Sequence, residues 1–326
     1  MLNPKTLAWT RRLRALAVTL LVLLGLQACR EQPAPSPASS VSASATIQAS
    51  ATASATAPAP ARATVGSTAR PFLYVASKGE AEGHLLGTMH MGGDPDDDLH
   101  EVVWKRFEAA PMVVIEADLG SVDPVALLRR MQLPPGQQLS SKLTPKQFKL
   151  LEDMLASVPP ALKVDQMKPH TAMSFLVQQM VPKTRPMDLV IQSRAKKANK
   201  KMGYLETVDA QMELIEEAID AEALAFSLDH LEEMNERLGQ MTKAYLKGDE
   251  KALVATVFDP EEMEEQPEMY ERLFTQRNAA WVKKLPSFFE EGAFVAVGAG
   301  HLLGDDSVVA MLRAEGWKVE RVTVTR

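Results

Sequence analysis

The stretch Phe294-Val295-Ala296-Val297-Gly298-Ala299-Gly300-His301 combines four apolar residues with a glycine-rich turn and a histidine. A short apolar run bounded by turn residues is typical of a buried strand. The sequence contains further runs of this kind, and each is predicted to be a strand. They are Leu85–Met89, Met112–Ile115, Met202–Leu205 and, at the end of the chain, Trp317–Val324.

Longer stretches with apolar residues at helical spacing separate these runs. The clearest start signal is Thr144 followed by Pro145, because proline favours the first position of a helix. The predicted helices are His100–Ala109, Pro145–Ser157, His170–Met180, Ala221–Leu246, Met269–Phe289 and a segment capped by Asp305 or Asp306 that ends near Glu315.

A histidine or a glutamate follows four of the predicted strands: His90, Glu116, Glu206 and His301. If the strands are parallel neighbours, their carboxyl ends open into one crevice, the usual ligand site of α/β sheets. Two imidazoles and two carboxylates there would suit a divalent metal such as Mn, Co or Zn, and would equally suit metal-free acid–base chemistry. One charged residue at a strand end commonly marks only the approach to solvent, so the prediction depends on all four.

The first thirty residues indicate export and lipid attachment. Four positive residues precede an apolar run, 15–26, that is too short to span a membrane. The quartet Leu26-Gln27-Ala28-Cys29 then resembles the lipobox of bacterial lipoproteins. Residues 1–28 are therefore predicted to be a lipoprotein signal peptide, with Cys29 lipidated, and the alternative is a plain secretory signal. Arg30 favours the outer membrane, so we expect a lipid-anchored protein in the periplasm or at the cell surface.

Composition separates a tether from a domain. Residues 29–69 are rich in Ala, Ser, Thr and Pro, and we expect a disordered tether because so few large apolar residues cannot offset ordering entropy. Residues 70–326 are then one domain. Removing residues 1–28 changes the formal charge from −6 to −10, which disfavours nucleic acid as a partner. Cys29 is the only cysteine, so once it is lipidated no thiol remains for disulfides or thiolate chemistry.

Five blocks occur in one order along the chain: Leu85-Leu-Gly-Thr-Met-His-Met-Gly92, Glu116-Ala-Asp-Leu119, Leu205-Glu-Thr207 with Gln211, Arg277-Asn278, and Val297 to Gly304. These blocks and their order resemble the motifs of the TraB/GumN family. The departure from the family pattern is Gln276, where glutamate often precedes the Arg-Asn pair.

The resemblance implies an α/β fold. The implied architecture is a central mixed, largely parallel sheet of two related halves, with a helical insertion at about 120–290. The wider group includes Tiki-type metalloproteases, in which two Gly-x-x-His motifs and a glutamate are implied to hold a metal. It also includes erythromycin esterases, whose His and Glu are implied to act without one. By resemblance the catalytic or metal-binding residues are His90, Glu116, Glu206 and His301, and the substrate-orienting residues are Thr88, Arg277 and Asn278.

These features lead to one favoured function and two alternatives. The favoured function is a metal-dependent hydrolase, such as a peptidase, with a divalent Mn, Co or Zn ion. The first alternative is a metal-free hydrolase in which a histidine, oriented by a glutamate, is the general base. The second is a non-catalytic envelope protein that binds a peptide or glycan. The expected partners are the membrane, through Cys29, and a peptide or other small substrate.

Overall fold

The computed structural model describes residues 70–159, 162–182 and 184–324. The predicted signal peptide, Cys29 and the predicted tether lie outside these residues. Among the helices of this described portion, none combines the length and hydrophobicity that a bilayer span requires.

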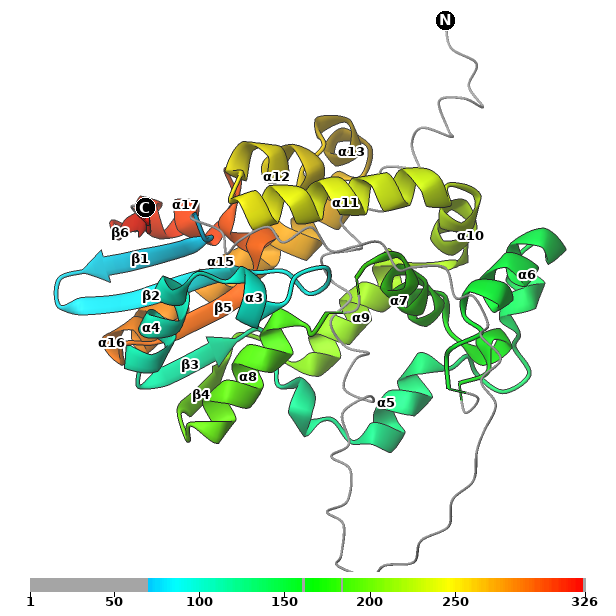
Figure 1. Ribbon diagram of the computed structural model, residues 1–326, viewed down its shortest axis with the longest axis horizontal. Coiled ribbons are helices and arrows are strands. Elements are labelled where there is room, and N and C mark those ends of the chain that lie inside the picture. Colours follow the sequence, from blue (N-terminus) through cyan, green and yellow to red (C-terminus); the bar gives the residue numbers. More distant parts are fainter. Residues whose placement is uncertain (1–69, 160–161, 183, 325–326) are drawn as a thin grey trace, which may run out of the picture.

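Six strands form one mixed sheet in the order β4-β3-β5-β2-β1-β6 (Figure 1). The strands β4, β3, β5 and β2 are parallel neighbours, whereas β1 is antiparallel to both β2 and β6. This confirms the predicted mixed, largely parallel sheet, while the relation between two halves stays a prediction. The strands are β1 Leu73–Lys78, β2 Ala81–Thr88, β3 Met112–Ile115, β4 Lys201–Tyr204, β5 Phe294–Gly298 and β6 Lys318–Arg321.

The first hairpin was not predicted. Strands β1 and β2 are joined by a tight turn in which Gly79 has φ +61°, a conformation that favours glycine. The predicted run Leu85–Met89 is only the second half of β2, because its first half is partly exposed and polar. A strand of mixed polarity that is completed by its hairpin partner gives no apolar run to detect.

Helices follow every parallel strand, and α5, α6, α7 and α10 lie beyond the carboxyl ends of these strands (Figure 1). Their bounds are α3 Pro95–Asp98, α4 Glu101–Ala109, α5 Pro124–Met131, α6 Pro145–Met154, α7 Pro169–Met180, α8 Met187–Lys197, α9 Val208–Ala218, α10 Ala221–Asp229, α11 Leu231–Lys247, α12 Glu250–Val257, α13 Pro260–Glu265, α14 Pro267–Tyr270, α15 Gln276–Val282, α16 Leu285–Glu290 and α17 Val308–Ala314.

Three helix predictions need correction. The predicted helix Ala221–Leu246 is two helices that meet at His230, which ends α10 and precedes α11. The predicted helix Met269–Phe289 is interrupted by a π-helical turn at Glu271–Thr275. The cap of α17 is Ser307, whose side chain accepts from the N–H of Ala310, so the assignment to Asp305 or Asp306 was wrong. Helices α3, α5, α8, α9, α12 and α13 were not predicted.

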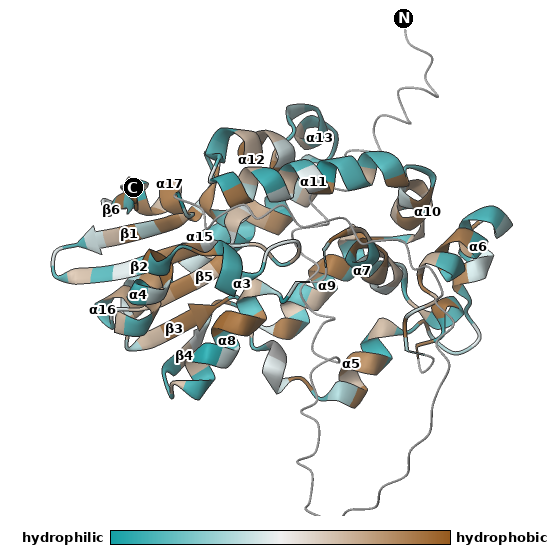
Figure 2. Ribbon diagram, viewed as in Figure 1, coloured by the Kyte–Doolittle hydropathy of each residue, from teal (hydrophilic) through white to brown (hydrophobic). Residues whose placement is uncertain are grey.

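The centre of the sheet is hydrophobic throughout. All five residues of β5 are buried, and the ring of Phe294 packs edge-to-face on Phe107 of α4 with centroids 5.7 Å apart. Figure 2 shows β3 and β5 as hydrophobic strands, whereas the visible face of α11 is largely hydrophilic. The inner face of α11 is tied to the sheet by the Tyr245 hydroxyl, which donates to the carbonyl of Gly87 at 2.8 Å. This bond fixes helix α11 over the end of β2.

Candidate active site

The carboxyl ends of β2, β3 and β5 meet around Gly298. A β-carbon added to Gly298 would lie 3.3 Å from Nε2 of His90, 3.4 Å from Oε1 of Glu116 and 3.6 Å from Cδ2 of His301. Because glycine has no side chain, this position leaves a point that the three groups share. The structure therefore brings together three of the four residues that follow predicted strands.

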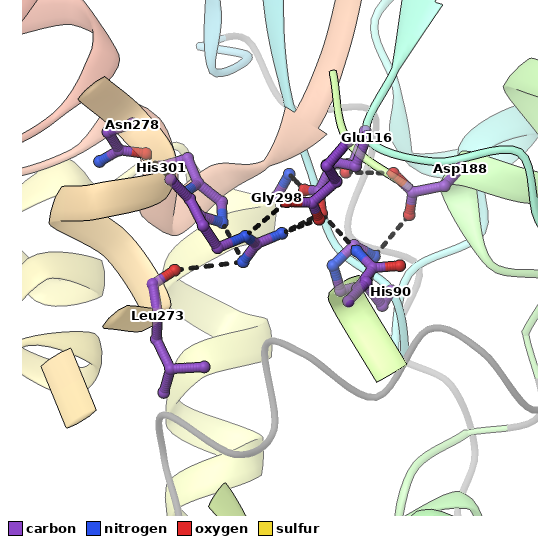
Figure 3. Close-up of polar contacts among 11 residues, drawn as sticks. His90, Glu116, Asp188, Leu273, Asn278, Gly298 and His301 are labelled. Carbon is purple, nitrogen blue, oxygen red and sulfur yellow. Dashed lines mark hydrogen bonds and ion pairs between the residues drawn. The ribbon is translucent and has the colours of Figure 1, made fainter. Parts of the chain in front are cut away.

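Figure 3 shows His90, Glu116, Gly298 and His301 gathered in one place. Arg277 connects the fourth residue, Glu206, to this group. Nη2 of Arg277 donates to Glu116 at 2.8 Å and to Glu206 at 2.7 Å, and Nε donates to Glu206 at 3.0 Å. Nη1 donates to Nε2 of His301 at 3.0 Å and to the carbonyl of Leu273 at 3.1 Å. A guanidinium has five N–H donors, so these bonds use all of them. Arg277 is the cation that joins Glu116, Glu206 and His301.

The carboxylate of Glu116 is fixed by three donors from three elements. Its Oε1 accepts from the backbone N–H of Gly298 at 2.7 Å, and its Oε2 accepts from Gln211 at 2.8 Å as well as from Arg277. Glu116 is the residue directly after β3 and is only 5% exposed. Hydrogen bonds at both oxygens offset the cost of burying this charge.

His90 is held by Asp188, a residue that the sequence analysis did not single out. Nδ1 of His90 lies 2.5 Å from Oδ2 of Asp188, and Thr88 donates its hydroxyl to Oδ1 of the same carboxylate at 2.7 Å. Nε2 of His90 is buried and has no hydrogen-bond partner among the described residues. Thr88, expected to orient a substrate, is fully buried and contacts Asp188 instead.

His301 is bonded at both ring nitrogens. Asn278 donates its side-chain N–H to the carbonyl of Asp306 at 2.8 Å, which leaves its Oδ1 to accept from Nδ1–H of His301 at 2.7 Å. The tautomer assigned from this network leaves Nε2 as the acceptor for Arg277. The ring also packs on Trp281, with centroids 4.3 Å apart. The lone pair of His301 is therefore already in use.

The pKa values of the two histidines shift in opposite directions. Burial alone would lower the pKa of His90, but the adjacent Asp188 carboxylate raises it above 6.5, and Glu116 contributes in the same direction. The pKa of His301 falls well below 6.5 because burial, and then the positive charge of Arg277, disfavour protonation. Burial also raises the pKa of Glu206 more than Arg277 lowers it. His90 is thus the histidine that accepts a proton more readily.

The four residues do not fit a shared divalent metal in this arrangement. The guanidinium of Arg277 already bonds Glu116, Glu206 and His301, and its bond to Nε2 of His301 uses the one ring lone pair that a metal would need. A cation added there would also be repelled by the guanidinium. Within the described part of the chain, no group of three His, Cys, Asp or Glu side chains forms a candidate metal site. Binding of Mn, Co or Zn stays a prediction that this geometry does not favour.

The site is enclosed. The side chains of Glu116 and Arg277 are 5% and 9% exposed, whereas that of Glu206 is 13% exposed. A cavity of about 10 Å³, enough for about one water molecule, is lined by Glu116, Asp188, Gln192 and Gln211 among others. A larger ligand must displace part of this cover, and Glu206 is the carboxylate nearest to solvent.

The residue missed by sequence reasoning, Asp188, lies near the start of α8. The buried face of α8 carries Asp188 and Gln192 one turn apart, beside the apolar Met187 and Ile191. Polar residues on an apolar helix face are unusual and were the available signal. Gln276, the departure from the family pattern, lies outside the site and donates to the exposed side chain of Glu271 at 3.1 Å.

The mixed six-stranded sheet and the enclosed His–Glu–Arg site define an α/β protein whose candidate site lies at the carboxyl ends of its parallel strands. The family model described as the TraB/PrgY/gumN family matches residues 72–321, so the chain belongs to this family. Similar proteins include YbaP of Shigella flexneri and YbaP of Escherichia coli (strain K12). Each is 24% identical over 253 residues, which cover 74% of this chain and 92% of the relative. No solved structure matches the chain.

Proposed function

We propose that this protein is a hydrolase that works without a metal ion and uses His90 to transfer protons. The observation that carries the proposal is the position of His90, with Nδ1 bonded to the buried Asp188 and Nε2 unpartnered beside Gly298. In His–Asp pairs of hydrolases, the carboxylate orients the ring and stabilises the imidazolium that forms when Nε2 accepts a proton. This is the metal-free alternative, with an aspartate in place of the expected glutamate.

Water is the nucleophile in this proposal. The single cysteine of the chain is Cys29, in the predicted lipid-attachment motif, and the hydroxyl of Thr88 is bonded to Asp188. Nε2 of His90 takes a proton from water as the water oxygen bonds to the carbonyl carbon of an ester or amide. The proton then passes to the leaving alcohol or amine as its bond to that carbon breaks. The products are a carboxylic acid and an alcohol or amine.

Arg277 supplies the positive charge that the reaction needs. Negative charge develops on the carbonyl oxygen during attack, and a fixed cation in a dry site stabilises it strongly. Glu116 and His301 hold the guanidinium from opposite ends, at Nη2 and Nη1. In this proposal both are positioning residues for Arg277.

The test is turnover of a panel of chromogenic esters and peptide amides by the full chain, with and without chelator. We expect activity to persist in chelator and His90→Gln to lower kcat by about 100- to 10,000-fold, the usual range for a general acid–base group. His100→Asn is the matched control, because His100 only caps α4 and asparagine is a good cap. Activity that chelator abolishes and Mn, Co or Zn restores would instead support the metal-dependent hydrolase.

Asp188→Asn tests the positioning role by a different readout. Loss of the carboxylate removes the charge that raises the pKa of His90, so the alkaline shift of the pH–rate profile should disappear. We expect the pH of half-maximal activity to fall, as for removal of an adjacent opposite charge. An unchanged pH profile with reduced activity would contradict this role and leave Asp188 as a structural residue.

A second candidate is a non-catalytic envelope protein that binds a peptide or glycan. Its support is the size of the site, since the small cavity beside Glu116 admits only about one water molecule and leaves no room for a substrate and water together. Such a protein would bind its ligand without turnover. Its affinity for that ligand would survive the double variant His90→Ala, His301→Ala.

We also propose that the chain is exported and anchored by lipid on Cys29, at the outer membrane and facing the periplasm or the cell surface. The positive residues, the apolar run and the quartet Leu26–Cys29 support this location. Metabolic labelling with radioactive palmitate should label the chain, and Cys29→Ser should abolish the label. Equal labelling of this variant would contradict the anchor.

A further inference from the structure

Glu206 differs from the other partners of Arg277. The carboxylate of Glu116 is also held by Gly298 and Gln211, and His301 is also held by Asn278, whereas the carboxylate of Glu206 has one further side-chain partner, Trp281. Glu206 lies in the short connection between β4 and α9, two residues after the strand and one residue before the helix cap Thr207. It is the most solvent-accessible member of the network, and both of its oxygens face Arg277.

The contact between Glu206 and Arg277 has the form of a ligand complex. Nε and Nη2 of Arg277 present two parallel N–H groups along one edge of the guanidinium, and Glu206 accepts from both at 3.0 and 2.7 Å. This paired geometry is the one by which arginine recognises carboxylates. The remaining donors of Arg277 are committed to Glu116, His301 and Leu273.

We infer that Glu206 occupies a binding site for the carboxylate of a small-molecule or peptide ligand, and that the Nε–Nη2 edge of Arg277 recognises that carboxylate. Displacing Glu206 would open the enclosed site from the solvent side and leave the buried part of the network in place. If the carboxylate ligand is also the substrate, the inference depends on the proposed hydrolase. Binding of a carboxylate to Arg277 does not.

The contact between Glu206 and Arg277 also explains why an added carboxylate would compete poorly for Arg277 in the unaltered chain. Glu206 is covalently tethered near Arg277, so its effective concentration is high, in the millimolar range for short tethers. Removing the Glu206 side chain would leave two buried N–H donors unpaired, which is costly. An added carboxylate should therefore bind to the variant and restore the lost contact.

The experiment is a titration of the full-length Glu206→Ala variant with acetate, followed by calorimetry and by the thermal unfolding midpoint, against chloride at equal ionic strength. We expect acetate to bind at least about tenfold more tightly to this variant than to the unaltered chain, and to raise its midpoint. Glu217→Ala is the matched control. Glu217 lies on α9 and pairs with Arg272, and both side chains are about half exposed, so acetate should have no effect there.

Two further variants keep the test decisive. Glu206→Gln keeps the size of the side chain, and it too should bind acetate more tightly than the unaltered chain; it replaces Glu206→Ala if that variant does not fold. Adding Arg277→Lys to either variant keeps the charge but removes the paired donors, and acetate binding should be lost. Acetate that binds neither Glu206 variant, or that binds all chains equally, would overturn the inference. Because no turnover is measured, failure of the hydrolase proposal would leave this result intact.

Discussion

The ends of β2 and β5 are alike in sequence and opposite in electrostatics. The strands are parallel neighbours with Thr88 opposite Gly298, and each is followed by a histidine three residues after a glycine, in Gly87-x-x-His90 and Gly298-x-x-His301. At the end of β2 the ring contacts a carboxylate, and the pKa of the histidine is raised. At the end of β5 the ring contacts a guanidinium, and the pKa is lowered.

This difference shows that the position of each histidine and the direction of its pKa shift are set by different parts of the chain. The Gly-x-x-His spacing places an imidazole at the carboxyl end of a parallel strand. The partner that sets its protonation comes from elsewhere, Asp188 from α8 and Arg277 from α15. Two copies of one motif can therefore take different roles, one as a proton carrier and the other as a neutral acceptor that holds a cation.

The largest expected difference is in catalysis. His90→Gln should lower kcat by about 100- to 10,000-fold, because glutamine cannot carry the proton. His301→Gln should lower it by about 10- to 100-fold, since it disturbs one charge-assisted hydrogen bond to Arg277 but removes no proton carrier. Steady-state kinetics on the same ester substrate compare the two. Equal losses in the two variants would break the distinction between the two strand ends.

The next effect is on stability, at the guanidinium beside the end of β5. Arg277→Met should lower the free energy of unfolding by about 3–5 kcal/mol, because it leaves the carboxylates of Glu116 and Glu206 buried without their cation. Denaturant unfolding measures it. Arg272→Met is the control, since its pair with Glu217 is exposed and worth about 0–1 kcal/mol. A cost below about 1 kcal/mol for Arg277→Met would show that the network is not a unit.

The pH dependence of stability should separate the two histidines. The raised pKa of His90 contributes stability that is full below the unfolded value of 6.5 and is lost as pH rises through the folded pKa. Asp188, Glu116, Arg277 and His301 are the charged or titratable groups around this ring.

The lowered pKa of His301 has the opposite sign. The folded state resists its protonation, so stability is full above 6.5 and falls as pH drops toward the folded pKa. His90→Gln should therefore flatten the alkaline side of the stability curve, and His301→Gln the acid side, by about 1.4 kcal/mol for each pKa unit shifted. Denaturant titrations from about pH 5 to 8.5 measure both. Buried His170, with a pKa lowered to about 4, keeps part of the acid slope in either variant.

The smallest effect is expected outside both strand ends. Gln276 precedes Arg277 but is bonded to Glu271 on the surface. Gln276→Glu, which restores the residue common in the family, should change the free energy of unfolding by less than about 0.5 kcal/mol, as for most surface changes. It should also leave kcat unchanged. A tenfold change in kcat would place this residue in contact with the site and extend the network beyond Arg277.

The elements that could be predicted from the sequence are those specified locally. Strand β3, Met112–Ile115, has the predicted bounds because it is buried on both faces and gives an uninterrupted apolar run. Helix α6 begins where Thr144 and Pro145 indicate, with a capping box completed by Gln147. Helix α8 escaped prediction, since its buried face mixes apolar residues with Asp188 and Gln192, whose burial depends on neighbours distant in sequence. Strand β1 was missed although it begins with the apolar run Leu73–Ala76, which becomes a strand by pairing with β2 and β6.

By itself, the sequence determined the family, the parallel strands and three of the residues that gather at Gly298, because strand ends and glycine spacings are local features. Only the tertiary structure decided that Asp188 joins His90, that Arg277 lies between Glu116, Glu206 and His301, and that the pKa values of the two histidines shift in opposite directions. The physical reason is that a pKa depends on the charges within a few ångströms and on access to water. Both are set by segments that meet only when the chain has folded.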